Sequence, residues 1–139
     1  MIALVMLVLV TMLSISAIRS TTMDERMAGN ARDRDKALQA ADAAVRTCLR
    51  QLTVDLPPTY AGPILPPVAT GAENWEIDAN WASGATNSVE VAMPGAGLAS
   101  NPRCLVERLG LGDNFRVTGR AVGGTDTSVV ILQATSSAD

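Results

Sequence analysis

Paired carboxylates near the middle of the first third of this chain are the residues most able to do acid–base chemistry. Asp24 is followed by Glu25, and Asp33 lies two positions before Asp35. Two neighbouring carboxyl groups can serve as general acid and general base when their environments separate their pKa values. Here the acids alternate with basic residues on a segment that reads as a helix, which favours surface ion pairs. The chain also has no histidine, the commonest general base.

The sequence shows no clear residue pattern for phosphate binding or for nucleic-acid binding. The glycine-rich stretches at 95–97 and 110–112 do not lie between a strand and a helix, as a phosphate-binding loop requires. Residues 54–139 carry four basic and nine acidic side chains, whereas nucleic-acid binding needs clustered lysine and arginine. We therefore expect no enzymatic activity, no cofactor, no metal site and no nucleic-acid partner.

The two cysteines, Cys48 and Cys104, are far apart in the sequence and belong to no CxxC pair. In an exported protein the default interpretation of two such residues is one structural disulfide. Two free, buried thiols are the alternative.

The elements that would position these residues begin with a long helix. The first eighteen residues carry no charge, and as a helix they would rise about 27 Å, enough to cross the hydrocarbon core of a bilayer. No proline occurs from 21 to 53, and apolar residues recur there at the spacing of one helix face: Leu38, Ala41, Val45, Cys48 and Leu52. Pro57 and Pro58 end the pattern. We predict one helix over 1–53, with 1–20 apolar enough to cross a membrane and 21–53 amphipathic.

Three interpretations of the apolar opening compete: a signal peptide, a plain membrane anchor, or the start of an already processed chain. A signal peptide is disfavoured because it would not form the first third of a continuous helix. Only Gly29 and Asn30 interrupt the helical composition. Gly29 is either a tolerated glycine or a soft point at which the helix can bend or melt.

The distal part of the chain reads as a small β domain. Residues 54–74 hold five of the seven prolines and predict an extended connector. Within 75–139, alternating or apolar runs predict short strands at 75–82, 88–93, 103–109, 115–122 and 128–135, the last two forming a hairpin around 123–127. The expected fold is α+β, one long N-terminal helix packed on a small, mostly antiparallel sheet. A disulfide between Cys48 and Cys104 would then attach this head to its own helix.

Three stretches follow the apolar opening: ERMAGN at 25–30, the Asp33–Arg34 pair, and the alanine-rich ALQAADA at 37–43. Together they resemble the type IV pilin class, and specifically the PilX-type pilus assembly proteins. The tail NFRVTGRAVGGTDTSVVILQATS is also similar to the end of these proteins. The N-terminal resemblance covers about 50 residues and is the more specific of the two.

The resemblance implies roles for residues along the helix. Met1 would be the methylated first residue left after a peptidase removes a basic leader. The apolar residues of the membrane or filament core would include Ile2, Leu4, Val5, Leu7, Leu9 and Leu13. A charge block would pair between subunits through Asp24, Glu25, Arg26, Arg32, Asp33 and Arg34. Most pilins have glutamate at the fifth position, and Val5 departs from that pattern in the way PilX-type proteins commonly do.

The function implied by the resemblance is that of a structural subunit, a minor pilin that supports pilus assembly, the tip complex, and adhesion or aggregation. Its partners would be other pilin subunits, the inner membrane before assembly, and the assembly machinery of that membrane. The protein would end at the cell surface in an extracellular pilus. Three alternatives stay open: a main filament-forming pilin despite Val5, a transport pseudopilin, and a membrane-anchored extracytoplasmic binding module.

Overall fold

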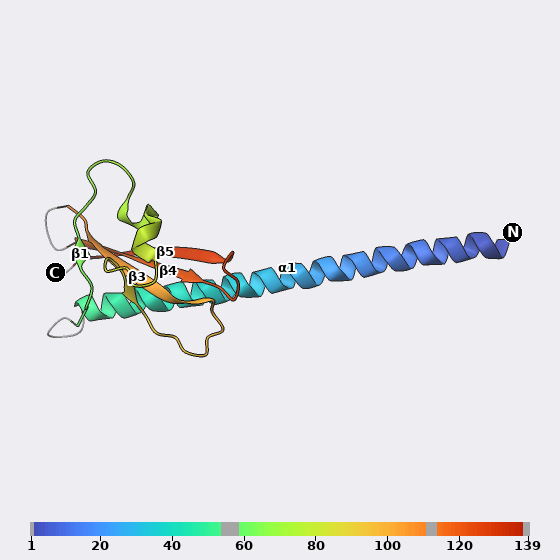
Figure 1. Ribbon diagram of the computed structural model, residues 1–139, viewed down its shortest axis with the longest axis horizontal. Helices are drawn as coiled ribbons and strands as arrows, with labels where there is room; N and C mark the ends of the chain where they lie inside the picture. Colours follow the sequence, from blue (N-terminus) through green and yellow to red (C-terminus); the bar gives the residue numbers. More distant parts are fainter. Residues whose placement is uncertain (1, 54–58, 111–113, 138–139) are drawn as a thin grey trace. The chain divides into compact units, whose positions relative to one another are not determined.

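The computed structural model describes residues 2–53, 59–110 and 114–137, and the chain forms two compact units, Met1–Arg32 and Asp33–Asp139 (Figure 1). Helix α1 (Ile2–Thr53) runs through the first unit and into the second without interruption. The predicted single helix is confirmed. Its continuity follows from the absence of proline and from the many alanine, leucine and arginine residues with high helix propensity.

The first unit is the apolar and then charged part of α1. Its hydroxyl residues do not interrupt the helix, because Thr11 Oγ1 donates to the Val8 carbonyl at 2.8 Å and Ser14 Oγ to the Val10 carbonyl at 2.9 Å. By length and composition, α1 is long and apolar enough to cross a membrane, and none of its most apolar window is buried within the chain.

The second unit contains the C-terminal part of α1 and a mixed five-stranded sheet, which confirms the α+β fold. Its strands are β1 (Ile64–Leu65), β2 (Val89–Glu90), β3 (Ser100–Arg108), β4 (Asn114–Val122) and β5 (Val129–Ser137). The order is β1-β3-β4-β5, and β3, β4 and β5 are successively antiparallel. The two short strands both pair with β3, β1 in parallel and β2 antiparallel.

The core lies between α1 and one face of the sheet. Small residues of the helix make up most of its buried stripe: Ala37, Ala40, Ala41, Ala44, Val45 and Cys48. They pack on the sheet at Cys104, Val106, Val117 and Ala121. Leu38, expected on this face, is 45% exposed instead. The alanines allow the helix to lie close to the sheet, and the larger leucine falls outside that contact.

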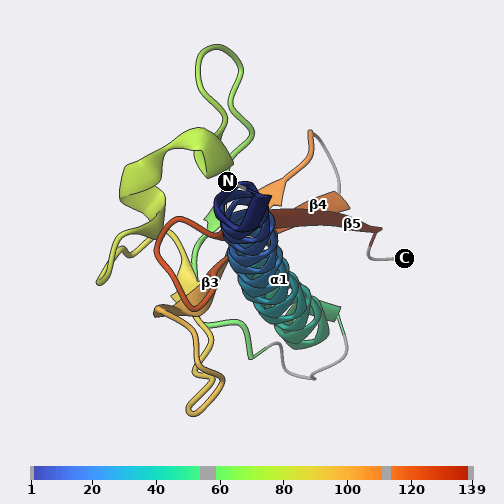
Figure 2. The same cartoon turned by 90° about the vertical axis from the view of Figure 1, so that its right-hand side faces the viewer.

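The predicted strand at 75–82 is wrong. Two short 3-10 helices replace it, η1 (Asn74–Glu76) and η2 (Asp78–Trp81). Local hydrogen bonds outweigh the alternating pattern here, since the Trp81 indole donates to the Trp75 carbonyl at 2.9 Å and the Glu73 amide to the Glu76 carboxylate at 2.9 Å. Figure 2 shows this yellow-green segment as helical ribbon rather than as a strand.

Two smaller differences concern the flanking segments. The strand expected at 88–93 is shortened to Val89–Glu90, although the Val91 amide still donates to the Pro102 carbonyl at 2.9 Å. Within the proline-rich connector, residues 64 and 65 form β1, which sequence patterns did not predict. Part of that connector, 54–58, lies outside the described residues.

Candidate assembly surface and its attachment to the head

The most extensive candidate surface is the apolar part of the first unit. The six residues predicted for a membrane or filament core are all exposed, at 81% for Ile2 and 71% for Leu13, with the others between 52% and 68%: Leu4, Val5, Leu7 and Leu9. A run of this size is stable only in lipid or against other protein surfaces. Met1, the predicted processed residue, lies outside the described residues.

The predicted charge block follows this apolar surface on the same helix. Within the part of the chain that the structure describes, none of its six members forms an ion pair within 4.0 Å. For three of the six the sequence explains why. Four positions after Asp24, Glu25 and Arg26 come Ala28, Gly29 and Asn30, which offer no opposite charge at the helical spacing.

Asp33 differs from the rest of the block because it contacts its own head. It is half-buried, and the turn between β4 and β5 packs against it. A Cβ added at Gly123 would lie 2.5 Å from the Asp33 backbone oxygen, and one at Gly124 would lie 2.9 Å from Asp33 Oδ1. Glycine is therefore required on this turn for the close approach. Arg32 and Arg34 on either side remain exposed.

Gly29, the predicted soft point, lies inside the uninterrupted α1. A Cβ added there would meet nothing within 4 Å. No close contact explains this glycine within the described residues, and the helical backbone passes through it unbroken. The structure therefore shows a tolerated glycine in this conformation, and a role as a soft point stays a prediction.

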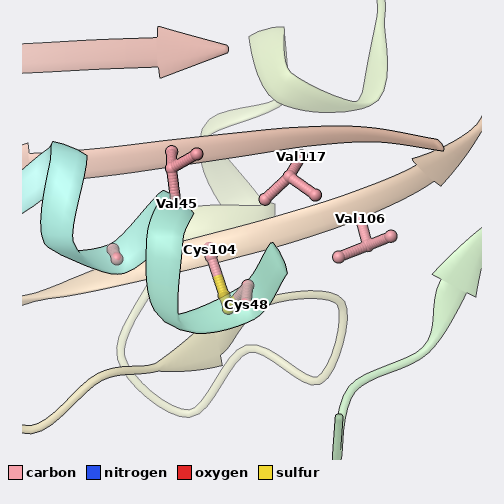
Figure 3. Close-up of a cluster of buried hydrophobic side chains, with 6 residues drawn as sticks. Val45, Cys48, Cys104, Val106 and Val117 are labelled. Atoms are coloured by element: carbon pink, nitrogen blue, oxygen red, sulfur yellow. A yellow bond between two sulfur atoms is a disulfide. The ribbon is translucent and has the colours of Figure 1, made fainter. Parts of the chain in front are cut away.

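The attachment of α1 to the head centres on a disulfide. Cys48 on α1 is bonded to Cys104 on β3, with 6.6 Å between their Cα atoms and neither side chain exposed. Figure 3 shows the bond joining a turn of α1 to the strand behind it, among Val45, Val106 and Val117. Gly119, the β4 partner of Cys104, lets the helix come close: a Cβ there would lie 2.7 Å from the Ala41 carbonyl oxygen.

A polar cluster around the buried Glu107 fixes Glu73 and the start of η1 to the sheet. Glu107 on β3, only 1% exposed, accepts hydrogen bonds from Asn74 Nδ2 at 2.7 Å and Arg116 Nε at 3.0 Å. Arg116 also pairs with Glu73. Burial lowers the pKa of Arg116, but its hydrogen bonds to Glu73 and Glu107 and their charges outweigh burial and raise it overall.

A second buried guanidinium organises the loop before β2. Arg103 donates to the carbonyl oxygens of Ala85 and Ser88 at 2.9 and 2.8 Å, and to Glu90 at 3.1 Å. Sequence reasoning missed both arginine clusters. The only sequence signal is an arginine and a glutamate inside otherwise apolar strands, where an unpaired charge would be costly. Both clusters are structural, because their donors are directed at the protein's own loops.

No cluster able to hold a metal ion occurs among the described residues: no three of the His, Cys, Asp and Glu side chains there come together. The candidate site consists of the exposed surface of the first unit and the attachment of α1 to the head. One unit presents apolar and then unpaired charged residues, and the other is a compact head joined covalently to the same helix.

Comparison with protein families gives two matches that together span nearly the whole chain. The model described as PilX N-terminal matches residues 1–46. The model described as Type IV pilus assembly protein PilX C-term matches residues 39–137. Among curated proteins and among solved structures, nothing matches.

Proposed function

Because the chain belongs to the PilX family of type IV pilus assembly proteins and is a minor pilin, we propose how its two units serve that role. Residues 1–20 anchor the protein in the inner membrane before assembly. The same residues then pack among the helices of other pilin subunits when the protein enters the pilus. The head lies at the pilus surface, where it supports the start of assembly, the tip complex, and adhesion or aggregation.

One observation carries this proposal: the apolar part of α1 is wholly exposed within the chain. Apolar side chains are equally stable among lipid tails and among other apolar helices, so one surface can serve in turn as anchor and as filament core. Ala3, Ser14 and Ala17 are small residues on this stretch that allow helices to approach closely.

The charge block supports the second step. Asp24, Glu25 and Arg26 have no partner at helical spacing, so their charges are available to neighbouring subunits. Pairs formed in a crowded filament lose less energy to solvent screening than pairs on an isolated helix. We propose that these residues set the register between subunits, whereas Asp33 mainly contacts the head.

The N-terminal residues support a minor role over that of the main subunit. We propose that Met1 is the processed, methylated residue. A main subunit would be expected to carry an acid at position 5 to pair with a neighbour's terminal amine, and Val5 cannot do so. Adding this chain to a filament therefore relies on apolar packing and on the charge block.

The test places a charge in the apolar surface. Leu7→Lys puts an ammonium group where lipid or apolar helices should lie. We expect the amount of this variant in sheared, purified pili to be at least about tenfold lower than that of the unchanged chain. Ile77→Lys, an exposed apolar position on the head, should enter pili as the unchanged chain does. Quantitative peptide mass spectrometry of pili and membranes measures both variants and reads the state of Met1.

The same measurement separates the alternatives. Trace abundance relative to the main subunit supports the minor role, and near-equal abundance would make the chain a filament builder. If the unchanged protein stays in the membrane fraction and never enters pili, the anchored binding module replaces the proposal.

A further inference from the structure

Strand β5 (Val129–Ser137) lies at one edge of the sheet. It pairs with β4 along its whole length, from Val129 opposite Val122 to Ser137 opposite Asn114. Among the described residues, no strand pairs with its other side. A nine-residue edge of this kind leaves a row of backbone N–H and C=O groups that can pair with another extended strand.

The composition of β5 does nothing to protect that edge. Its sequence, VVILQATSS, contains no charge, no proline and no glycine. Natural proteins usually place such residues on edge strands to prevent pairing with other chains. The neighbouring strands do carry charges, including Arg103, Glu107, Arg116 and Arg120. Of the three long strands, β5 is therefore the one that lies at the open edge and also the one that carries no charged residue.

The outward side chains of β5 are also exposed and apolar at one end. Val129 is 42% exposed and Ile131 is 39% exposed, whereas Val130 and Leu132 point to the helix side and pack on the core. Beside the start of β5, Leu38 and Arg34 of α1 line a groove with these residues. The edge thus combines open backbone groups with β-branched residues that favour strand pairing.

We propose that β5 is an interface between two copies of this chain, in which the two β5 strands pair antiparallel. The second copy is favoured because β5 is neutral, so that self-pairing brings no like charges together. The nine residues align fully when Gln133 faces Gln133 of the second copy. Val129 then faces Ser137, and Ile131 faces Thr135. This register keeps the exposed side chains of both strands on one face, as a two-fold, self-complementary interface requires.

The test uses cross-linking by a single introduced cysteine in the full-length protein in detergent. Both native cysteines are in the buried disulfide, so an introduced thiol is the only free one. Opposed residues of antiparallel strands have Cα atoms about 5 Å apart, within the range that a disulfide spans. Gln133→Cys should therefore form a covalent dimer under mild oxidation. Thr127→Cys, exposed in the β4–β5 turn, is the control for random collision, and we expect it to react at least about tenfold more slowly.

The register is tested by two further variants with different tags. Ile131→Cys and Thr135→Cys should cross-link when mixed, and neither should cross-link efficiently alone, because identical positions would be about 14 Å apart along the strands. Equal reaction of all four variants would indicate collision through the membrane segments and would overturn the proposal.

Charge substitution completes the test. In the Gln133→Cys background, Ile131→Lys should abolish the cross-link, because a charged, hydrated lysine on an edge strand opposes pairing with another chain. Ile77→Lys is the matched control, since Ile77 is also 39% exposed. Thr135→Lys, at another exposed position of β5, should also abolish the cross-link. Agreement between the two β5 variants shows that misfolding of one of them is not the cause. If Gln133→Cys reacts no faster than Thr127→Cys, or if all three lysine variants cross-link equally, β5 is not an interface between copies.

Discussion

Gly119→Ala tests the closest approach of α1 to the sheet. The added Cβ would lie 2.6 Å from Val45 Cγ2 and 2.7 Å from the Ala41 carbonyl oxygen. The valine methyl can turn away, but the carbonyl belongs to the helix backbone. Restoring an ordinary contact of 3.4 Å requires the helix and strand to separate locally by about 0.7 Å. The adjacent Cys48–Cys104 bond resists that movement.

The expected cost is at the upper end of the range for overpacked cores, about 3 kcal/mol of the free energy of unfolding. Urea unfolding of the full chain in detergent measures it through the fluorescence of Trp75 and Trp81, both in the second unit. With a denaturant slope of about 1.5 kcal/mol/M, the midpoint should fall by roughly 2 M.

Gly29→Ala is the control, since its Cβ meets nothing within 4 Å. It should leave the tryptophan transition unchanged while stabilising the surrounding helix by up to about 1 kcal/mol, seen as slower amide exchange. A midpoint for Gly119→Ala within about 0.3 M of the unchanged protein would refute the argument, because it would mean that α1 moves freely on the sheet.

Three further predictions concern the head. Replacing Cys48 and Cys104 together by alanine should lower the free energy of unfolding by about 4 kcal/mol and increase the urea slope, because the unfolded chain loses a cross-link between residues 56 apart. Glu107→Gln should lower the melting temperature measured by calorimetry, with a loss of about 1.5 kcal/mol in the free energy of unfolding, since Arg116 loses its charged hydrogen bond to Glu107 and keeps the pair with Glu73. Burial raises the pKa of Tyr60, the only tyrosine, to about 12, and the smaller effect of the Val106 backbone opposes it. Because the unfolded phenol ionises near pH 10, stability should fall as pH rises from about 10 to 12, and phenolate absorbance should appear together with unfolding.

The long elements of the fold could be predicted because each has a strong local pattern. Helix α1 follows from a proline-free sequence, and β3, β4 and β5 follow from apolar runs separated by turn residues. The segment at 75–82 differs from the predicted strand, although its residues alternate between apolar and polar. There the Trp81 indole binds the Trp75 carbonyl, and Asn80 is buried with its side chain bonded to the Asn74 carbonyl.

The candidate site was predictable only in part, for a related reason. With two cysteines in the chain, the sequence allows only one intramolecular disulfide, so that its partners needed no structural information. The cluster around Glu107 and Arg116 joins two strands and the distant helix η1, which begins at Asn74. No local spacing relates these residues, because their proximity depends on the sheet register. The exposure of Leu38 likewise depends on how closely α1 approaches the sheet at Gly119.

The position of the disulfide has a mechanical consequence for a protein that is pulled by its helix. A covalent route runs along α1 to Cys48, across the bond to Cys104, and on through β3, β4 and β5. The residues between the two cysteines form a closed ring beside this route. While the disulfide is intact, the roughly 190 Å that these residues would span if extended cannot add to the length of a stretched molecule. Under load, that ring can neither lengthen the subunit nor be the part that releases it. Extension of the subunit under load therefore depends on the residues outside the ring.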